Sequence, residues 1–187
     1  MSLIVYKGAK LNVKVETFDL TAKEFNIVKK AVNIIGKAVN SEEFKDFVLN
    51  FSWEKKYYTG FWFWKKWHIK RGFEFRWNKN LSNYEVYEKM MSGAEVLDPV
   101  EDREIDIYLK IDRRNKKGVV GYMYKGKKWQ YTYAWVFRKY DEYGIAGNLL
   151  HEWAHHVGFS HERKYNPLRE FSVPYALGRY IEGLKNG

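Results

Sequence analysis

Residues 151–161 of this chain read His151-Glu152-Trp153-Ala154-His155-His156-Val157-Gly158-Phe159-Ser160-His161. The stretch holds four of the five histidines in the 187 residues, arranged as H-E-x-x-H followed by x-x-G-x-x-H. On an α-helix, His151 and His155 would lie one turn apart on the same face, so both imidazoles could reach one metal ion. The spacing therefore predicts a helix over residues 145–157 that carries two ligands of a zinc ion.

Glu152 follows the first of these histidines directly in the sequence. It would lie on a neighbouring helix face, where its carboxylate can hydrogen-bond a water in an open coordination position without binding the metal itself. Zinc lowers the pKa of such a water towards about 7, so Glu152 could accept its proton during attack on a carbonyl carbon and pass it to the leaving amine. Glu152 is therefore the predicted general base of a hydrolase.

Gly158 and His161 complete the pattern. A glycine with positive φ can end the helix and turn the chain back, which would bring His161 to the metal as the third ligand. Glu162 and Glu170 remain alternative third ligands, because glutamate also binds zinc in some hydrolases. Two further histidines are predicted to be ordinary surface side chains: His156 and His68.

The full pattern resembles the long zinc signature of the metzincin metallopeptidases. Residues 158–162 extend it to G-F-x-H-E, which is similar to the astacin branch, although residues 163–166 do not continue that similarity. The resemblance is local and covers about a dozen residues. It implies a zinc-dependent endopeptidase that binds its peptide or protein substrate as an extended strand, along an exposed edge strand at residues 119–124.

The chain departs from the metzincins beneath the predicted metal site. Those enzymes carry a methionine turn after the signature, whereas all four methionines here precede it: Met1, Met90, Met91 and Met123. The nearest replacement is 172–175, a Ser-Val-Pro-Tyr segment in which the proline favours a rigid turn. The resemblance implies that Tyr175 is catalytic, binding zinc or donating a hydrogen bond to an oxyanion. Two alternatives stay open: Tyr175 packs in the core, or the fold binds metal without turnover.

The length of 187 residues predicts one domain, 1–187, which the resemblance divides into an N-terminal part, 1–158, and a small C-terminal part, 159–187. The chain has no cysteine, so disulfides and thiolate chemistry are excluded, and a reducing compartment such as the cytoplasm is expected. Neither a signal peptide nor an apolar run long enough to span a membrane is visible. The sequence does not indicate an oligomeric state.

The formal charge of +10 raises nucleic acid, an anionic membrane or an acidic substrate as partners. The lysines and arginines come in pairs across many segments where turns are expected, which predicts a solvated rim. A basic nucleic-acid-binding protein therefore remains an alternative function, without a motif to support it.

Alternating apolar residues predict strands at 11–18, 105–111, 119–124 and 129–137, and helical spacing predicts a long helix near 22–39 that begins with a capping box at Thr21. Shorter helices are expected at 41–49 and 83–91. The fold class is therefore α+β, with a twisted mixed sheet of about five strands backed by the long helix and the zinc helix.

Residues 57–77 are the densest aromatic stretch of the chain. Aromatic rings interleaved with lysine could form a stacking platform for single-stranded nucleic acid or sugars. The alternation of Phe73, Phe75 and Trp77 with polar residues is also typical of a half-buried strand. We therefore expect a hairpin that belongs to the sheet and the core, with glycines at 60 and 72 marking its turns.

Overall fold

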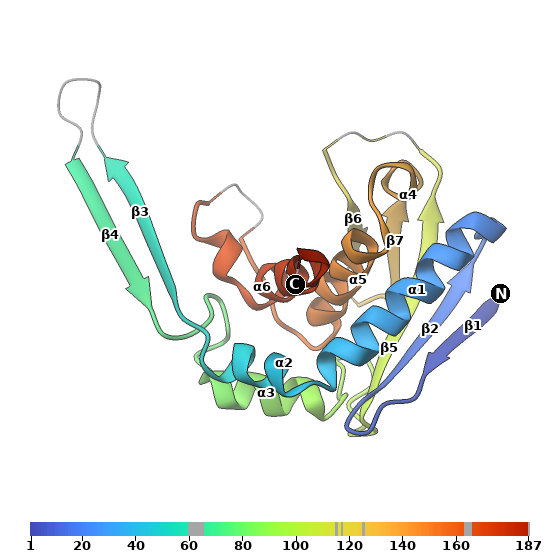
Figure 1. Ribbon diagram of the computed structural model, residues 1–187, viewed down its shortest axis with the longest axis horizontal. Coiled ribbons are helices and arrows are strands. Elements are labelled where there is room, and N and C mark those ends of the chain that lie inside the picture. The colour runs from blue at the N-terminus through green and yellow to red at the C-terminus, as the bar shows by residue number, and fades with distance from the viewer. Residues whose placement is uncertain (60–65, 115, 117, 125, 163–165, 187) are drawn as a thin grey trace.

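The computed structural model describes residues 1–187 except 60–65, 115, 117, 125, 163–165 and 187. For residues 58 and 59 it describes the backbone but not the side chains. The described residues form an α+β fold with six α-helices and two β-sheets (Figure 1). In chain order the elements are β1 (Ser2–Tyr6), β2 (Asn12–Phe18), α1 (Ala22–Val39), α2 (Glu42–Leu49), β3 (Trp53–Thr59), β4 (Lys66–Gly72), α3 (Asn83–Met91), β5 (Glu104–Asp112), β6 (Gly121–Met123), β7 (Trp129–Tyr133), α4 (Val136–Lys139), α5 (Glu142–His156), the 3-10 turn η1 (Arg169–Phe171), α6 (Val173–Gly183) and the 3-10 turn η2 (Leu184–Asn186).

The main sheet has five strands in the order β1-β2-β5-β7-β6. β2, β5 and β7 are parallel, whereas β1 and β6 pair antiparallel at the two edges. This confirms the predicted mixed sheet of about five strands and places the expected edge strand, shortened to β6, at an edge. β1 was not expected from the sequence, because it follows the N-terminus without a clear alternation.

Alternate residues of the central strands point to a face of the sheet that α1 and α5 cover. Val13, Val15, Ile105, Ile107 and Leu109 are all buried on this face. Burying one such side chain stabilises the fold by about 1.5 to 3 kcal/mol, so this layer is the main source of stability. The predicted capping box of α1 is confirmed, because the side chains of Thr21 and Glu24 bond to each other's backbone N–H groups.

α5 and α6 pack closely against each other. A Cβ atom added to Gly147 of α5 would lie 2.7 Å from the carbonyl oxygen of Gly178 in α6, and one added to Gly178 would lie 3.1 Å from the carbonyl oxygen of Gly147. Glycine at both positions therefore lets the two backbones approach more closely than side chains would allow. This contact brings the start of α6 beside the histidines of α5.

The aromatic stretch differs from the expectation. β3 and β4 form a separate two-stranded antiparallel sheet that projects from the body, and not a part of the main sheet (Figure 1). The predicted strand through Phe73 and Trp77 is also wrong: Phe73 is exposed, and Trp77 has φ 52°, which extended chain does not adopt. Phe75 alone is buried, stacked on Phe51 at 3.9 Å. The expectation for residues 61–64 lies outside the described residues.

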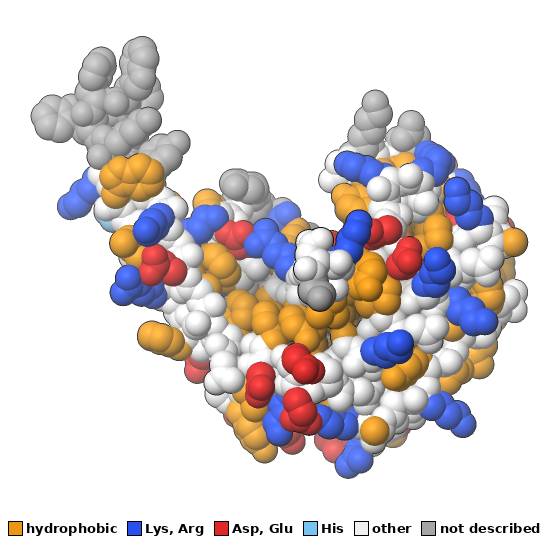
Figure 2. Space-filling view, viewed as in Figure 1, with side chains coloured by type: hydrophobic (Ala, Val, Ile, Leu, Met, Phe, Trp, Pro, Cys, Tyr) orange, Lys and Arg blue, Asp and Glu red, His pale blue; other side chains and the backbone are white. Residues whose placement is uncertain are grey.

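Two other boundaries are corrected. β7 ends at Tyr133, because residues 134–139 turn into the short helix α4 in place of continuing the strand to 137. Lysine and arginine side chains are spread over the visible face of the molecule, as expected for a solvated rim (Figure 2). Among the described residues, no helix combines the length and the apolar character needed to cross a membrane.

Candidate metal centre

His151, His155 and His161 come together as the sequence predicts. One ring nitrogen of each can be chosen so that all three lie within 4.8 Å of one another. The ring centroids are 5.2 Å apart for His151 and His155, 5.3 Å for His151 and His161, and 4.9 Å for His155 and His161. The first two project from α5 and the third from the segment that follows it. This arrangement is compatible with three ligands around one ion.

Gly158 ends α5 and lets the chain turn so that His161 reaches the other two histidines. Its φ of 99° lies in the region that favours glycine, and its N–H donates to the carbonyl oxygen of His155 at 3.0 Å. The N–H of Phe159 then donates to the carbonyl oxygen of Ala154 at 3.0 Å. A Cβ atom at Gly158 would also lie only 2.9 Å from the side chain of Val96. The predicted glycine turn is therefore confirmed, and both conformation and space require it.

Backbone carbonyls orient the three imidazoles. The Nδ1 atoms of His155 and His161 lie 2.9 Å and 3.0 Å from the carbonyl oxygens of Phe159 and Glu162. His151 also forms a hydrogen bond with the backbone of Pro174. Because a carbonyl oxygen only accepts, Nδ1 of His155 and His161 must carry the proton, which leaves Nε2 as the metal-binding atom. Burial lowers the pKa of all three histidines, and this keeps the imidazoles neutral, as metal binding requires. These donors fit a zinc ion.

Glu152 is buried beside the histidines. Within the described part of the chain its carboxylate has no hydrogen-bond partner, so its lone pairs remain available to a ligand. Burial raises its pKa to about 7. A carboxyl group with a pKa near neutral pH can both accept and donate a proton, which suits the predicted role of general base.

Tyr175 lies against the triad. Its ring centroid is 4.6 Å from that of His151 and 4.8 Å from that of His161. The segment that carries it is not the expected turn: Val173 begins α6, and Pro174 occupies the first helical turn. A proline is tolerated there because that N–H would have no helical partner in any case. The guanidinium of Arg169, which sequence reasoning missed, lies 4.6 Å from the Tyr175 ring centroid.

The alternative third ligands are engaged elsewhere. Glu170 accepts from Lys55 and Arg179, each at 2.5 Å. Glu162 accepts from the side-chain amide of Asn166 at 2.7 Å. The structure therefore places a ring nitrogen of His161 close to those of His151 and His155, and it places neither glutamate there.

His156 is buried, so its prediction as a surface histidine is wrong. Its Nδ1 lies 3.8 Å from one carboxylate oxygen of Glu95, and the other oxygen of Glu95 accepts from Trp153 Nε1 at 2.6 Å. Burial raises the pKa of Glu95 to about 8 and lowers that of His156 to about 4, so the pair is neutral near pH 7. Sequence reasoning missed Glu95 because it lies 58 residues before Trp153 and 61 residues before His156. The N–H of Val96 donates to the carbonyl oxygen of His156 at 2.8 Å, which fixes this loop to the end of α5.

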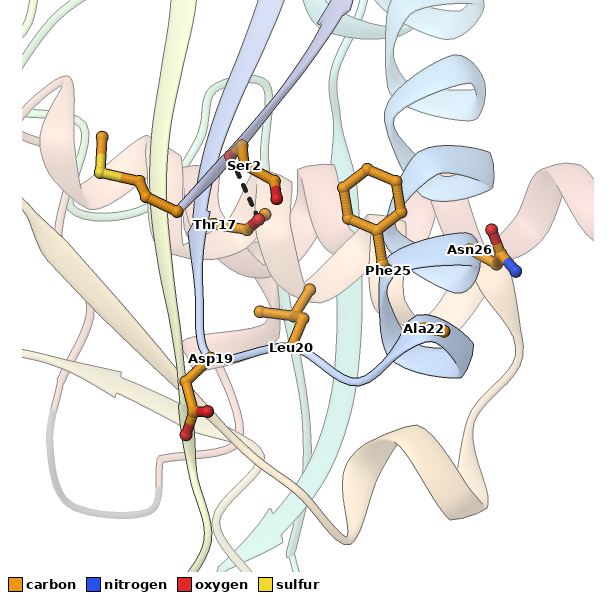
Figure 3. Close-up of a pocket in the computed structure, with 8 residues that line it drawn as sticks. Ser2, Thr17, Asp19, Leu20, Ala22, Phe25 and Asn26 are labelled. Carbon is orange, nitrogen blue, oxygen red and sulfur yellow. Dashed lines mark hydrogen bonds between the residues drawn. The ribbon is translucent and has the colours of Figure 1, made fainter.

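Other features are weaker candidates for a site. Asp102, Glu104 and Asp106 also place oxygens within 4.8 Å, but Lys14 lies 3.8 Å and 3.5 Å from the last two, which partly neutralises them. A hollow of about 420 Å³ lies between β1 and the start of α1 (Figure 3). Asp19 is the charged residue among those that line it, and the Thr17 hydroxyl there donates to the Ser2 carbonyl oxygen at 3.2 Å. Neither feature combines metal ligands with a free acid or base.

Comparisons with known proteins do not assign the chain to a family. A scan against protein-family models finds no match. A search of curated proteins and a search of solved structures likewise find no significant match. A proposal of function therefore rests on the geometry of the candidate site alone.

Proposed function

We propose that this chain is a zinc-dependent endopeptidase of metzincin-like character, with His151, His155 and His161 as the metal ligands. The observation that carries the proposal is a buried carboxylate, Glu152, that has no hydrogen-bond partner among the described residues and directly follows the first of three histidines whose ring nitrogens converge. In His155 and His161 a backbone carbonyl holds Nδ1, which leaves Nε2 for a metal. A structural zinc site has no use for an acid and base at this position. A hydrolytic site requires one.

The residues would divide the work as follows. Bound zinc would supply a Lewis acid that polarises the scissile carbonyl and activates water. Glu152 would accept the proton of the attacking water and then donate it to the leaving amine, which breaks the peptide bond. The Tyr175 hydroxyl would donate a hydrogen bond to the developing oxyanion, a contribution of about 2.7 to 4 kcal/mol to transition-state binding.

The edge strand β6 supports a polypeptide substrate. β6 pairs only on the side of β7 within the described sheet, so its other edge can add an extended segment. Asn148, three residues before the first ligand on α5, lies against β6: a Cβ atom on Gly121 would be 3.4 Å from its side chain. A segment paired with β6 would therefore run close to the metal-binding turn of α5.

Zinc titration and proteolysis together test the proposal. Wild-type protein should bind one zinc ion per chain, and His155→Ala should bind it far more weakly because one ligand is lost. The zinc-loaded wild type should cleave an unfolded protein, and a chelator should abolish the cleavage. Zinc binding that is equal in wild type and His155→Ala would contradict the ligand assignment.

The same experiment distinguishes the endopeptidase from the alternative of a metal-binding protein that has no catalytic turnover. Tight zinc binding that depends on all three histidines, with no cleavage of any unfolded protein or peptide library, would reject the endopeptidase and retain the metal centre. Binding to a heparin column with neither zinc nor cleavage would favour the basic nucleic-acid-binding alternative.

A further inference from the structure

The second face of the main sheet, away from α1 and α5, carries aromatic and basic side chains. We call it the open face and define it by the exposed or partly exposed outward residues of the strands, which alternate with the buried ones: Leu3, Val5, Asn12, Lys14, Glu16, Phe18, Glu104, Asp106, Tyr108, Lys110, Tyr122, Trp129 and Tyr131. All of them are partly or fully exposed. Phe18 is 49% exposed, and Tyr124, which follows β6, is 57% exposed.

The strand register aligns these rings across the sheet. Phe18, Lys110, Tyr131 and Tyr122 form one cross-strand row, and Tyr108 lies opposite Trp129 in the next. The rings of Tyr122 and Tyr131 stack at 4.9 Å with an interplanar angle of 5°. Rings on four strands, β2, β5, β7 and β6, therefore share this face, with Lys110 between Phe18 and the rings of β7.

Lysines cover the faces of these rings. The Lys110 ammonium lies 4.2 Å from the Trp129 ring centroid and 5.3 Å from that of Phe18. The Lys128 ammonium lies 4.3 Å from the Tyr108 ring centroid. No described carboxylate forms an ion pair with either lysine, so both charges remain available to an anion.

Most acidic residues of the same face are already paired with basic or hydroxyl groups. Lys14 lies 3.5 Å from Asp106. Asp112 accepts from Arg114 at 2.6 Å and from the Tyr122 hydroxyl at 2.9 Å. Glu16 lies beside Tyr108 in the second row, and among the described residues it is the carboxylate of this face that has neither an ion-pair nor a hydrogen-bond partner. Among the described residues, Lys110 and Lys128 are therefore cations of this face that no carboxylate engages in an ion pair.

A hollow continues the row at its β6 end. It has a volume of about 410 Å³ and is lined by Arg114, Lys116 and Tyr133, together with Tyr122 and Tyr124. Its charged side chains are both basic. Rings and cations thus extend beyond the strands into a space large enough to hold part of a ligand.

We propose that the open face binds single-stranded nucleic acid, with bases stacked on the rings and phosphates held by the lysines. Stacking a base on an aromatic side chain contributes about 1 to 3 kcal/mol, whereas an exposed cation–π contact contributes about 0.5 to 1 kcal/mol. A base can therefore displace an ammonium from a ring. The displaced lysine remains within reach of the adjoining phosphate, so the positive charge is retained in the complex.

This proposal is independent of the endopeptidase. The face lies on the other side of the sheet from α5, so binding there would attach the chain to nucleic acid and leave the metal centre free. A double-stranded duplex fits less well, because its bases are stacked on each other and cannot cover flat rings.

Fluorescence anisotropy tests the proposal with labelled oligonucleotides of about 15 nucleotides, oligo-dT and oligo-rU, against a duplex of equal length. Wild type should bind the single strands more tightly than the duplex, and the dT and rU arms show whether DNA or RNA is preferred. Tyr131→Leu should weaken single-strand binding by roughly 5- to 140-fold, the equivalent of one lost stacked base. Tyr131→Phe keeps the ring and should bind like wild type.

Charge variants provide the matched control. Lys110→Gln with Lys128→Gln should weaken binding and reduce the slope of log K against log salt by about 1.4, for two lost phosphate contacts. The double variant Lys23→Gln with Lys29→Gln removes the same charge from α1, on the other side of the sheet. It should change neither the affinity for single strands nor the salt slope. An equal loss of affinity in the open-face double variant and in the α1 double variant would overturn the proposal, because net charge alone would then explain binding.

Two further results would overturn it. The first is unchanged single-strand affinity in Tyr131→Leu when its melting temperature matches that of wild type. The second is loss of binding in a hairpin pair, Lys56→Gln with Lys70→Gln, while the open-face variants bind normally. The experiments do not require zinc, so failure of the endopeptidase proposal would not affect the result.

Discussion

The candidate site, formed by α5, the segment that follows it and the start of α6, and the hairpin of β3 and β4 are both rich in aromatic and titratable side chains, yet they differ in burial. Trp153 of α5 is fully buried, whereas Trp67 and Ile69 of β4 are 69% and 54% exposed. The hairpin is anchored at its base, where Trp53 stacks on Phe171 at 4.8 Å. Composition alone therefore does not create a reactive site. Burial among fixed partners shifts pKa values and orients rings.

The largest expected difference between the two regions concerns catalysis. Glu152→Gln should reduce peptidase turnover by roughly 1,000-fold or more, because it removes the base and keeps the zinc ligands. The matched change Glu54→Gln in β3 should leave turnover unchanged. Steady-state kinetics with zinc content measured in parallel checks both. Full activity in Glu152→Gln, after contaminating protease is excluded, would contradict the mechanism.

Stability should differ between the regions by a few kcal/mol. Leu149→Ala in α5 removes a fully buried side chain and should lower the free energy of unfolding by about 2 to 5 kcal/mol. Ile69→Ala in β4 should change it by less than about 0.5 kcal/mol, because the side chain is mostly exposed. Denaturant unfolding followed by circular dichroism measures both. A similar loss in the free energy of unfolding for the two variants would show that the hairpin side chains are buried against the body in solution.

The phenol next to the triad should matter less than the base. Tyr175→Phe keeps the ring that contacts His151 and His161 and deletes the hydroxyl, so turnover should fall by roughly 100-fold with zinc affinity unchanged. Tyr57→Phe, which alters the tyrosine stacked on His68 in the hairpin, should have no effect. Unchanged turnover in Tyr175→Phe would assign that residue to packing.

The smallest expected effect is a change in pH dependence. Because burial raises the pKa of Glu95 to about 8, the folded chain keeps a proton that the unfolded chain loses above the ordinary value of 4.5. The contribution of Glu95 to stability should therefore fall as pH rises from about 4.5 to 8, whereas His156, whose pKa burial lowers to about 4, contributes in the opposite direction up to its ordinary value of 6.5. Glu95→Gln should remove the falling contribution, so that the variant loses less stability than wild type, or gains more, across this range. Melting temperatures across that range check the result, and an unchanged slope would show that Glu95 is not the responsible group.

The sequence predicts a site best where the chemistry is local. The two proposed ligands on α5 are one helical turn apart. The third proposed ligand follows a glycine, the residue type that tolerates φ 99°, and Glu152 adjoins the first. Strand positions also followed from alternation, since β2 and β5 each bury one set of alternate residues. These features depend on spacings of a few residues, which the sequence contains directly.

Tertiary structure decided the contacts between distant segments. The alternation of aromatic and polar residues in 57–77 was compatible with a strand packed on the core. Among the described residues, however, β3 and β4 pair only with each other, so the hairpin projects from the body. Pro174 was compatible with a turn, but the close packing of α6 on α5 places it in a helix. His156 became buried because Glu95 reaches it from 61 positions earlier in the chain. Sequence spacing determined which residues could form the centre, whereas packing energy, which depends on every surface at once, determined what surrounds it.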